Sequence, residues 1–287
     1  MPELPEVETV RRGLEPVLVG RRLTRVEARR PDLRFPLPDR FAARLEGARV
    51  EALLRRAKYL VANLDTGETL IAHLGMSGRF TIRTPMQSMA PGAFYYADDP
   101  DPTHTHIVFT TDAGDRIEYN DPRRFGFMDI AATADLAGHK SFRTLGPEPL
   151  GPEFDAAALA AAVSGSRQPV KAALLDQSVV AGLGNIYVCE ALHLAGISPM
   201  RRAGRVSARR LGVLVETIRV VLEAAIAAGG SSLKDFADAQ GALGYFQHRF
   251  RVYDREGAPC QREGCGGVVA RRVQAGRSTF YCPICQT

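Results

Sequence analysis

The spacing of hydrophobic residues is helical at the start of the chain and then changes. In "PEVETVRRGLEPVLVG" the apolar residues recur at helical intervals: Val7, Val10, Leu14, Val17 and Leu18. This spacing predicts an amphipathic helix, and Pro5 suits its first turn. From about Arg21 to Ile130 the pattern becomes short β-like runs such as "LTRVEAR" and "THIVFTT", separated by turn residues in "DTGE" and "DAGD". Antiparallel hairpins have this texture, so we expect a β-sandwich that carries the first helix.

A second change follows "TLGPEPLGPEF", a stretch rich in proline and glycine that is typical of a linker. Beyond it lie alanine- and leucine-rich segments that end in glycine, such as "DAAALAAAVSG" and "IYVCEALHLAG", as helices often do. We therefore expect an α+β multidomain protein. Its predicted segments are 1–135 (sandwich and leading helix), 136–155 (linker), 156–250 (helical domain) and 251–287 (cysteine-rich tail).

Composition narrows the class of protein. A length of 287 residues suits two domains with an appendage, and 45% hydrophobic residues is ordinary for a globular chain. No apolar run reaches the roughly eighteen residues of a membrane span, and the start lacks the pattern of a secretion signal. We expect an intracellular, cytoplasmic protein without a membrane partner. The net charge of +5 is compatible with a nucleic-acid partner but does not require one.

Four of the five cysteines lie in the tail: Cys260, Cys265, Cys282 and Cys285. They form two close pairs, which is the ligand set that a tetrahedral structural zinc requires. The intervening "VVARRV" and "RSTFYC" predict a β-hairpin around the metal. Two disulfides in a secreted module are the alternative, which the missing secretion signal disfavours. The hairpin carries Arg271, Arg272 and Arg277, which either form a solvated surface or bind phosphate. The tail alone would therefore also fit a DNA-binding protein without catalytic activity, which is the rival class of function.

The first residues, "MPELPEVET", carry a second kind of chemistry. Removal of Met1 would leave Pro2 with a free secondary amine, and terminal amines have a pKa of about 8, so a useful fraction is neutral. A neutral amine attacks an aldehyde-like carbon, and a secondary amine then gives a cationic iminium that favours elimination. Glu3 and Glu6 are placed to handle protons. The alternative reading is an ordinary helix start, since prolines and acids both suit a first turn.

Motifs along nearly the whole chain are specific to one family. They include "MPELPEVETVRRGL", "RRAKYL", "HLGMSGRF", "NDPRRFGF", "GLGNIYVCEALHLAGISP", "GGSSLKDF" and "GRSTFYCPICQ". With the cysteine tail, they resemble the bacterial formamidopyrimidine-DNA glycosylase (8-oxoguanine DNA glycosylase) family. The resemblance implies a helix-two-turns-helix domain, one structural zinc ion and monomeric action near the nucleoid. It also implies excision of oxidised purines from duplex DNA, opposite cytosine, followed by β,δ-elimination.

The same resemblance implies catalytic roles. Pro2 is the expected Schiff-base nucleophile at the sugar C1′, and Glu3 is the general acid that opens the sugar. Glu6 supports the site and positions water. Lys58 donates protons during β-elimination and binds phosphate. Arg277 holds the phosphate of the damaged nucleotide and assists δ-elimination.

Extrusion of a nucleotide leaves a void and an orphaned cytosine in the duplex. By resemblance, Met76 fills the void, Phe125 is the wedge and Arg123 reads the cytosine with its planar donors. As isolated residues, Met76 and Phe125 would be read as core. Further DNA contacts are expected at His73, His104, Arg124, Arg167, Lys171, Asn185 and Lys234.

Two departures from the family pattern stand out, and neither touches a predicted catalytic residue. Four residues separate the first cysteine pair, where two are common, and the loop 84–102 is extended without an assigned role. "DFADAQGALGYFQ" matches a mobile loop that covers the flipped base.

The nearest rival is the endonuclease VIII type, which prefers oxidised pyrimidines. Its "PEGPE" start differs from "PELPE" here, which favours the purine branch.

Overall fold

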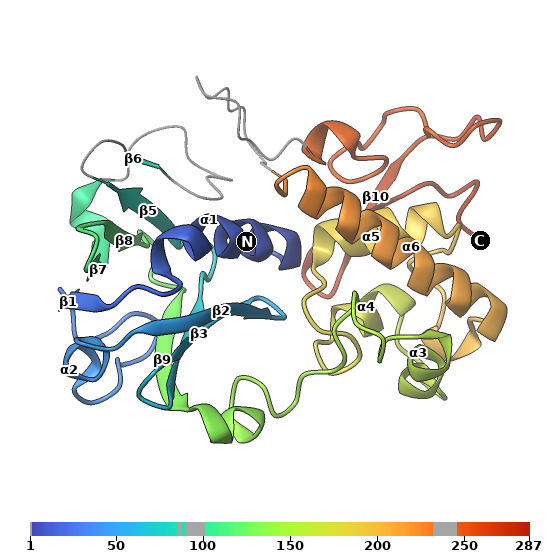
Figure 1. Cartoon of the computed structure of the whole chain (residues 1–287). Coiled ribbons are helices and arrows are strands. Elements are labelled where there is room, and N and C mark those ends of the chain that lie inside the picture. Colours follow the sequence, from blue (N-terminus) through green and yellow to red (C-terminus); the bar gives the residue numbers. More distant parts are fainter. Residues whose placement is uncertain (1, 85–87, 90–100, 232–245) are drawn as a thin grey trace. The chain divides into compact units, whose positions relative to one another are not determined.

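In a computed structural model of the chain, the first amphipathic stretch forms helix α1 (Leu4–Leu18), which lies along the β-rich part (Figure 1). The structure describes residues 2–84, 88–89, 101–231 and 246–287. Contacts divide the chain into two units, one of residues 1–143 and 228–245 and the other of residues 144–227 and 246–287. The domain boundaries expected from the sequence stay predictions.

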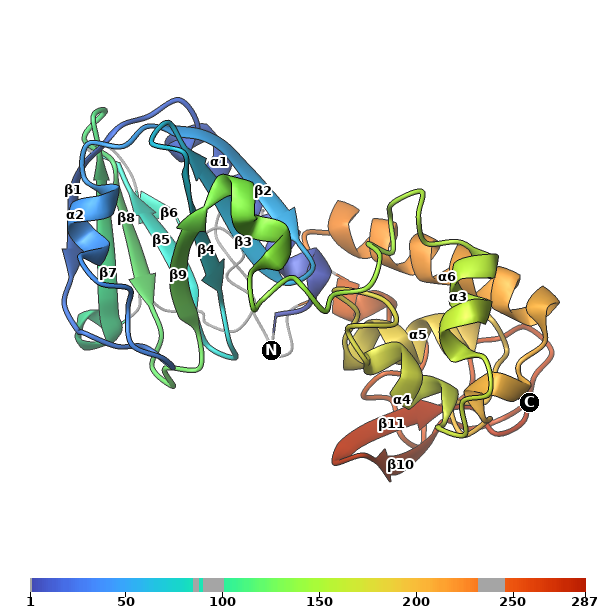
Figure 2. The same ribbon diagram turned by 90° about the horizontal axis from the view of Figure 1, so that it is seen from below.

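The first unit is an antiparallel β-sandwich, as predicted. One sheet has the order β1-β7-β8-β5-β6 and the other β2-β3-β4-β9, and Figure 2 shows the two layers face to face. Their bounds are β1 (Leu23–Ala28), β2 (Val50–Arg56), β3 (Tyr59–Leu64), β4 (Glu68–His73), β5 (Arg79–Arg83), β6 (Ser88–Met89), β7 (Thr105–Thr111), β8 (Arg116–Asn120) and β9 (Phe127–Ala132). Short helices accompany the strands: α2 (Phe41–Leu45), η1 (Pro102–His104) and η2 (Thr133–Gly138).

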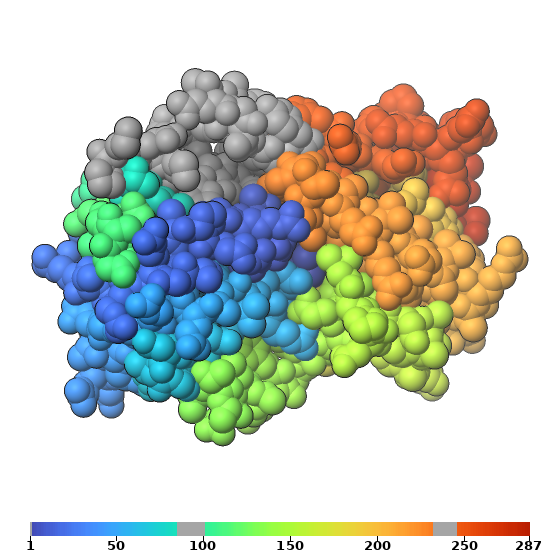
Figure 3. Space-filling model, in the orientation of Figure 1, coloured from blue at the N-terminus to red at the C-terminus, as the bar shows by residue number. Residues whose placement is uncertain are grey.

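Helix α1 completes the core of the first unit. Its apolar residues are buried in the core cluster formed by both sheets, whereas Arg12 and Glu15 are exposed; the helix itself, in blue, lies at the surface in Figure 3. Glu8 pairs with Arg55 of β2 at 3.4 Å, and the Arg11 guanidinium donates to the Leu53 carbonyl at 3.1 Å. As the helix runs from Glu8 to Arg11, its partners run backwards along β2. The start of α1 and the β2–β3 turn therefore lie at the same end of the sandwich.

The second unit is helical and ends in a β-hairpin. Its elements are α3 (Ala156–Val163), α4 (Val170–Leu175), α5 (Asn185–Leu194), η3 (Ala203–Arg205), α6 (Ala208–Ala227), η4 (Phe246–Arg249), β10 (Ala270–Gln274) and β11 (Arg277–Tyr281). Helix α5 is buried all round, which marks it as the centre of this unit. Cys189 of α5 packs with Val269 and Phe280 of the tail, as filler in a small apolar cluster.

The tail is tied to the helices by directional contacts. The Glu190 carboxylate of α5, itself buried, accepts the backbone N–H groups of Arg251, Val252 and Tyr253 at 2.8–3.0 Å. Gln286 donates to the Ile197 carbonyl at 2.9 Å, and the Thr287 N–H donates to Gly196 at 3.1 Å. The α+β class with a sandwich, a helical domain and a finger-like tail is confirmed. Among the described residues, no helix combines the length and apolar character that crossing a bilayer needs.

Candidate active site and DNA-binding surfaces

The N-terminal segment is held inside the first unit by a buried carboxylate. Pro2 is buried directly before α1, and Glu3 and Glu6 are 4% and 1% exposed. Glu6 Oε2 accepts the Glu3 N–H at 2.8 Å. Glu6 Oε1 accepts both the N–H and the hydroxyl of Ser231, at 2.9 and 3.0 Å. Glu6 thus ties the residue after Pro2 to a segment 225 positions away in the chain.

Lys58 lies in the β2–β3 turn, at the end of the sandwich where α1 begins. Ala57, just before it, has a positive φ of 51°, so the chain reverses sharply at this point. Lys58 is 8% exposed. The structure therefore places Lys58 at the same end of one unit as Pro2 and Glu3, as the predicted chemistry requires.

The predicted filler and wedge meet at one pocket of the first unit. Met76 and Phe125 are 37% and 42% exposed, which is high for large apolar side chains. Arg123 lies over the Phe125 ring at 4.8 Å, and Arg124 pairs with Asp32 at 3.6 Å. These residues line an open pocket of about 690 Å³. The alternative reading of Met76 and Phe125 as core is wrong.

The two loops that carry these side chains are held by Asp121. Its Oδ2 accepts the Gly126 N–H at 2.8 Å and the Tyr119 hydroxyl at 3.3 Å, and its Oδ1 accepts the Ser77 hydroxyl. The Arg123 N–H in turn donates to Ser77 Oγ at 3.1 Å. Burial and the charge of Asp121 raise the pKa of Tyr119, so its hydroxyl stays a donor. The loop that carries Met76 (filler loop, 74–78) and the loop that carries Phe125 (wedge loop, 121–126) are therefore joined by hydrogen bonds into one body.

Gly75 lets these loops approach each other. It has a φ of +62°, and a Cβ there would come within 2.3 Å of the Phe125 backbone. A side chain would force the filler loop away from the wedge loop. The glycine in "HLGMSG" is thus required by packing as well as by the turn.

His73 and His104 flank this region. Burial, with the charges of Lys58 and Arg34 next, lowers the pKa of His73 to about 4. The Gly75 N–H donates to His73 Nδ1 at 3.0 Å, so the neutral ring carries its hydrogen on Nε2. His73 therefore offers one fixed donor. The His104 carbonyl accepts the Asp121 N–H at 3.0 Å, which ties η1 to the wedge loop.

In the second unit, two predicted DNA contacts converge on the hairpin. Lys171 of α4 is 1% exposed, and its ammonium donates to the Ser278 carbonyl at 3.1 Å and to Thr279 Oγ1 at 2.7 Å. Asn185 donates to the same carbonyl at 2.9 Å. Both side chains thus support the residue that follows Arg277. Arg277 itself is exposed beside the tight hairpin turn, and Arg167 is exposed before α4.

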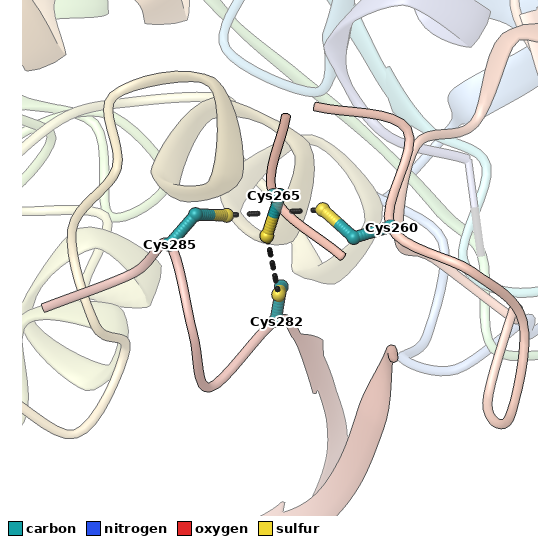
Figure 4. Close-up of side chains that lie close together, drawn as sticks. All are labelled: Cys260, Cys265, Cys282 and Cys285. Atoms are coloured by element: carbon teal, nitrogen blue, oxygen red, sulfur yellow. Dashed lines mark hydrogen bonds between the residues drawn. The ribbon is translucent and has the colours of Figure 1, made fainter. Parts of the chain in front are cut away.

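The four tail cysteines converge on one point (Figure 4). Their sulfurs lie within 4.8 Å of one another, with Cys260–Cys285 at 3.8 Å and Cys265–Cys282 at 3.6 Å. A tetrahedron of thiolates at about 2.3 Å from zinc has sulfur–sulfur edges of about 3.8 Å. The cluster is therefore positioned to bind one zinc ion. All four positions are protein ligands, so the metal holds the tail and does no chemistry.

Some predicted residues cannot be placed. Met1, Lys234, most of the loop 84–102 and most of the "DFADAQGALGYFQ" segment lie outside the described residues. The sequence interpretation also missed supporting residues, namely Ser77, Asp121 and Ser231. All three lie inside the quoted motifs, but their role depends on contacts between distant segments that no local pattern shows.

Comparison with known proteins agrees with this architecture. The formamidopyrimidine-DNA glycosylase N-terminal domain matches residues 1–128, the H2TH (helix-two-turns-helix) domain of the same enzymes matches 145–237, and a zinc finger found in FPG and IleRS matches 257–287. A formamidopyrimidine-DNA glycosylase of Phenylobacterium zucineum is 64% identical over 286 residues, which is 100% of both chains. Lactococcus lactis Fpg in complex with DNA containing an abasic site is similar at a TM-score of 0.86 and 33% identity, over 100% of both chains. A mutant of that Fpg, bound to DNA containing Fapy-dG, gives the same TM-score, identity and coverage.

A sandwich that begins with a buried proline, an H2TH domain and a four-cysteine finger define a DNA glycosylase of base excision repair. The chain belongs to the formamidopyrimidine-DNA glycosylase family.

Proposed function

We propose that this glycosylase removes oxidised purines, namely 8-oxoguanine and formamidopyrimidines, through a Schiff base on Pro2 and then cuts the strand as an AP lyase. The observation that carries the proposal is the buried Glu6 carboxylate, which closes the capping box of α1 through the Glu3 N–H and also accepts the N–H and hydroxyl of the distant Ser231. A capping box alone accounts for the Glu3–Glu6 contact of an ordinary helix start, but it does not call for the second partner, Ser231, 225 positions from Glu6. A reactive N-terminus does, because its nitrogen must be held in one place.

Base removal follows from the amine. The nitrogen lone pair of Pro2 forms a bond to the sugar C1′, and the C1′–N9 bond breaks with its electrons on the purine. The N–H proton of the ammonium formed in this way passes to the departing purine, so the Pro2 nitrogen regains a lone pair. Glu3 then gives a proton to O4′ as the C1′–O4′ bond breaks. The nitrogen pair makes the second C1′–N bond, which yields the cationic iminium.

Strand cleavage uses the iminium as an electron sink. Loss of a proton from C2′ breaks the C3′–O bond, and Lys58 protonates the departing 3′-phosphate oxygen. Loss of a further proton from the sugar breaks the C5′–O bond in δ-elimination, which Arg277 assists by holding the phosphate. Water finally hydrolyses the iminium and restores the Pro2 amine.

The wedge and filler give access to the base. Phe125 enters the stack, Met76 occupies the space of the extruded nucleotide, and Arg123 donates to the orphaned cytosine. Support comes from the exposure of both apolar side chains and from the Asp121 hydrogen bonds that hold their loops. His73, His104, Arg124, Arg167, Asn185 and Lys234 are the proposed further DNA contacts, and Lys171, which is 1% exposed, is proposed to act on the DNA through the hairpin that it holds.

The proposed substrate is duplex DNA with the oxidised purine opposite cytosine, and the proposed active form is a cytoplasmic, nucleoid-associated monomer. The Lactococcus lactis relatives were solved with DNA containing Fapy-dG and with DNA containing an abasic site. The first is an oxidised purine, and the second is the product of base removal. Both match the two stages of the proposed reaction.

Borohydride trapping tests the proposal. The protein with Met1 removed is incubated with duplexes that carry 8-oxoguanine, a formamidopyrimidine or thymine glycol, and borohydride reduces any iminium. We expect a covalent complex that is strongest with the oxidised purines and absent when one residue precedes Pro2. Preferential trapping on thymine glycol would indicate the endonuclease VIII type. Tight binding of the purine duplexes without any trapped complex would indicate a DNA binder that has lost catalysis.

A further inference from the structure

An imidazole from the helical part of the second unit lies against the cysteine cluster. His193, in the last turn of α5, is 1% exposed, and its Nε2 is 3.3 Å from Cys260 Sγ. No predicted zinc or DNA role includes this residue. Among the described residues, no other side-chain nitrogen bonds to one of the four sulfurs.

The direction of this hydrogen bond follows from the chemistry of the ligand. A zinc-bound cysteine is a thiolate and can only accept. Nε2 must then carry the hydrogen of a neutral ring. The other ring nitrogen, Nδ1, is buried without a partner in the described part of the chain. In this tautomer Nδ1 carries no hydrogen, so no buried N–H group is left without an acceptor. The opposite tautomer would bury an orphaned N–H and turn a lone pair toward the thiolate.

Arg262 holds the two partners together from the other side. Its backbone N–H donates to Cys260 Sγ at 3.5 Å. Its guanidinium donates to the carbonyls of His193 and Leu194, at 2.6 and 3.0 Å, where α5 ends. One residue therefore bonds both to the cysteine and to the backbone of the histidine. The contact is braced on both sides.

We propose that His193 is a positioning residue of the zinc site, whose N–H holds the Cys260 thiolate and protects it from electrophiles. Outer partners of metal ligands orient them, and their loss typically weakens metal binding about ten- to a hundredfold. A hydrogen bond to a thiolate also draws charge from the sulfur, and the thiolate is the nucleophile in cysteine chemistry. Cys260 is only half-buried, so electrophiles in solution can reach its sulfur and the hydrogen bond can slow their reaction with it. The contact would also couple zinc retention to the integrity of α5.

The test compares His193→Gln with His193→Met in the full-length zinc protein. The two side chains have similar size and helix propensity, but only glutamine offers an N–H near the position of Nε2. Zinc affinity is measured by competition with a chromogenic chelator. We expect His193→Met to bind zinc about ten- to a hundredfold more weakly than wild type and His193→Gln to stay within about threefold. His139→Phe is a control, because the same kind of bond, from His139 Nε2 to Asp129 at 3.3 Å, lies in the first unit.

A second readout needs no variant. The wild-type zinc protein is labelled with N-ethylmaleimide, and the rate at each cysteine is followed by peptide mass spectrometry. We expect Cys260 to react more slowly than the other half-buried ligands, Cys265 and Cys285, and to become the first to react in His193→Met. Equal zinc affinity of the Met and Gln variants would overturn the proposal. So would Cys260 reacting first in the wild type, and this result stands even if the methionine variant does not fold.

Discussion

The two units share one device, a buried carboxylate that accepts backbone N–H groups (Glu190 in the second unit), but they differ in how the functional residues themselves are held. In the first unit, the buried carboxylates of Glu6 and Asp121 accept backbone N–H and hydroxyl groups and thereby fix loops. In the second, a buried ammonium, Lys171, and a four-thiolate metal site hold the hairpin that bears Arg277. The first unit organises its site with the chain alone, whereas the second depends on a metal.

This difference has a physical origin. A sandwich with a helix in its core buries enough apolar surface to support loops by hydrogen bonds alone. The tail from Cys260 to Thr287 contributes few core residues, and small segments of this kind need a metal or disulfides to stay folded. Damage to the metal site should therefore be local to the second unit, and damage to Glu6 or Asp121 should be local to the first.

Zinc removal should have the largest effect on one unit while leaving the other intact. Structural zinc supplies roughly 10–16 kcal/mol of apparent folding free energy, so its loss should unfold the tail. Chelation should raise amide hydrogen exchange across residues 257–287 to near that of an unfolded chain. Exchange in the strands of the sandwich should stay unchanged, and DNA affinity should fall at least about a hundredfold. Tail protection that survives complete zinc removal would contradict the division between the units.

Next in size is Glu6→Gln. The amide replaces one acceptor oxygen with a donor, which must face an N–H of Glu3 or Ser231, and such an unmade bond costs about 1–3 kcal/mol. We expect the free energy of unfolding of the first unit, measured with denaturant, to fall by this amount. The yield of the borohydride-trapped complex should fall about tenfold or more. Ser231→Ala should have a smaller effect, because its backbone N–H still reaches Glu6. Glu15→Gln is the matched control on the exposed side of α1. If Glu6→Gln behaves like Glu15→Gln, the buried contact does not position the site.

Lys171→Met sharpens the comparison in the second unit. Without the ammonium, the Ser278 carbonyl keeps only the hydrogen bond from Asn185, and the free energy of unfolding should fall by about 1–3 kcal/mol. We expect faster amide exchange in β11 and slower strand cleavage, with an unchanged salt dependence of DNA binding. A direct phosphate contact would instead lower the slope of log K against log salt by about 0.9. Lys140→Met is the control, since that lysine is 66% exposed and pairs with Asp129.

The smallest expected effect, for a change of one pH unit, is that of His73 on the pH dependence of stability. His73 has a pKa of about 4 in the folded chain, against the ordinary value of 6.5. As pH falls below about 6.5, the unfolded chain takes up this proton first, so the stability due to neutral His73 is lost progressively until about pH 4. His73→Phe should flatten the loss of unfolding free energy in this window by at most about 1.4 kcal/mol per pH unit. Acid also releases zinc from both proteins, and subtracting the wild-type curve of unfolding free energy against pH from that of the variant removes this shared contribution. Parallel curves would show that His73 titrates normally.

The sequence predicted the elements and the cysteine cluster better than the residues that support the site. Helical spacing in α1, the β-texture up to Ile130 and the cysteine spacing are local patterns, and the structure has each of them. Met76 and Phe125 are indistinguishable from core residues by periodicity; neighbouring turn residues permit their exposure, and the family motifs indicated it. Ser231 and His193 act through partners 225 and 67 positions away, which no local pattern encodes. Lys171 was predicted as a DNA contact, and its burial against the hairpin became visible only in three dimensions.

The central claim is that the amine of Pro2 is the reagent. It is tested most directly by digesting the borohydride-trapped complex of the Met1-processed protein with 8-oxoguanine DNA and mapping the adduct by mass spectrometry. We expect the sugar remnant on the N-terminal peptide, at the nitrogen of Pro2. An adduct on a lysine, such as Lys58, with an unmodified Pro2 would contradict it.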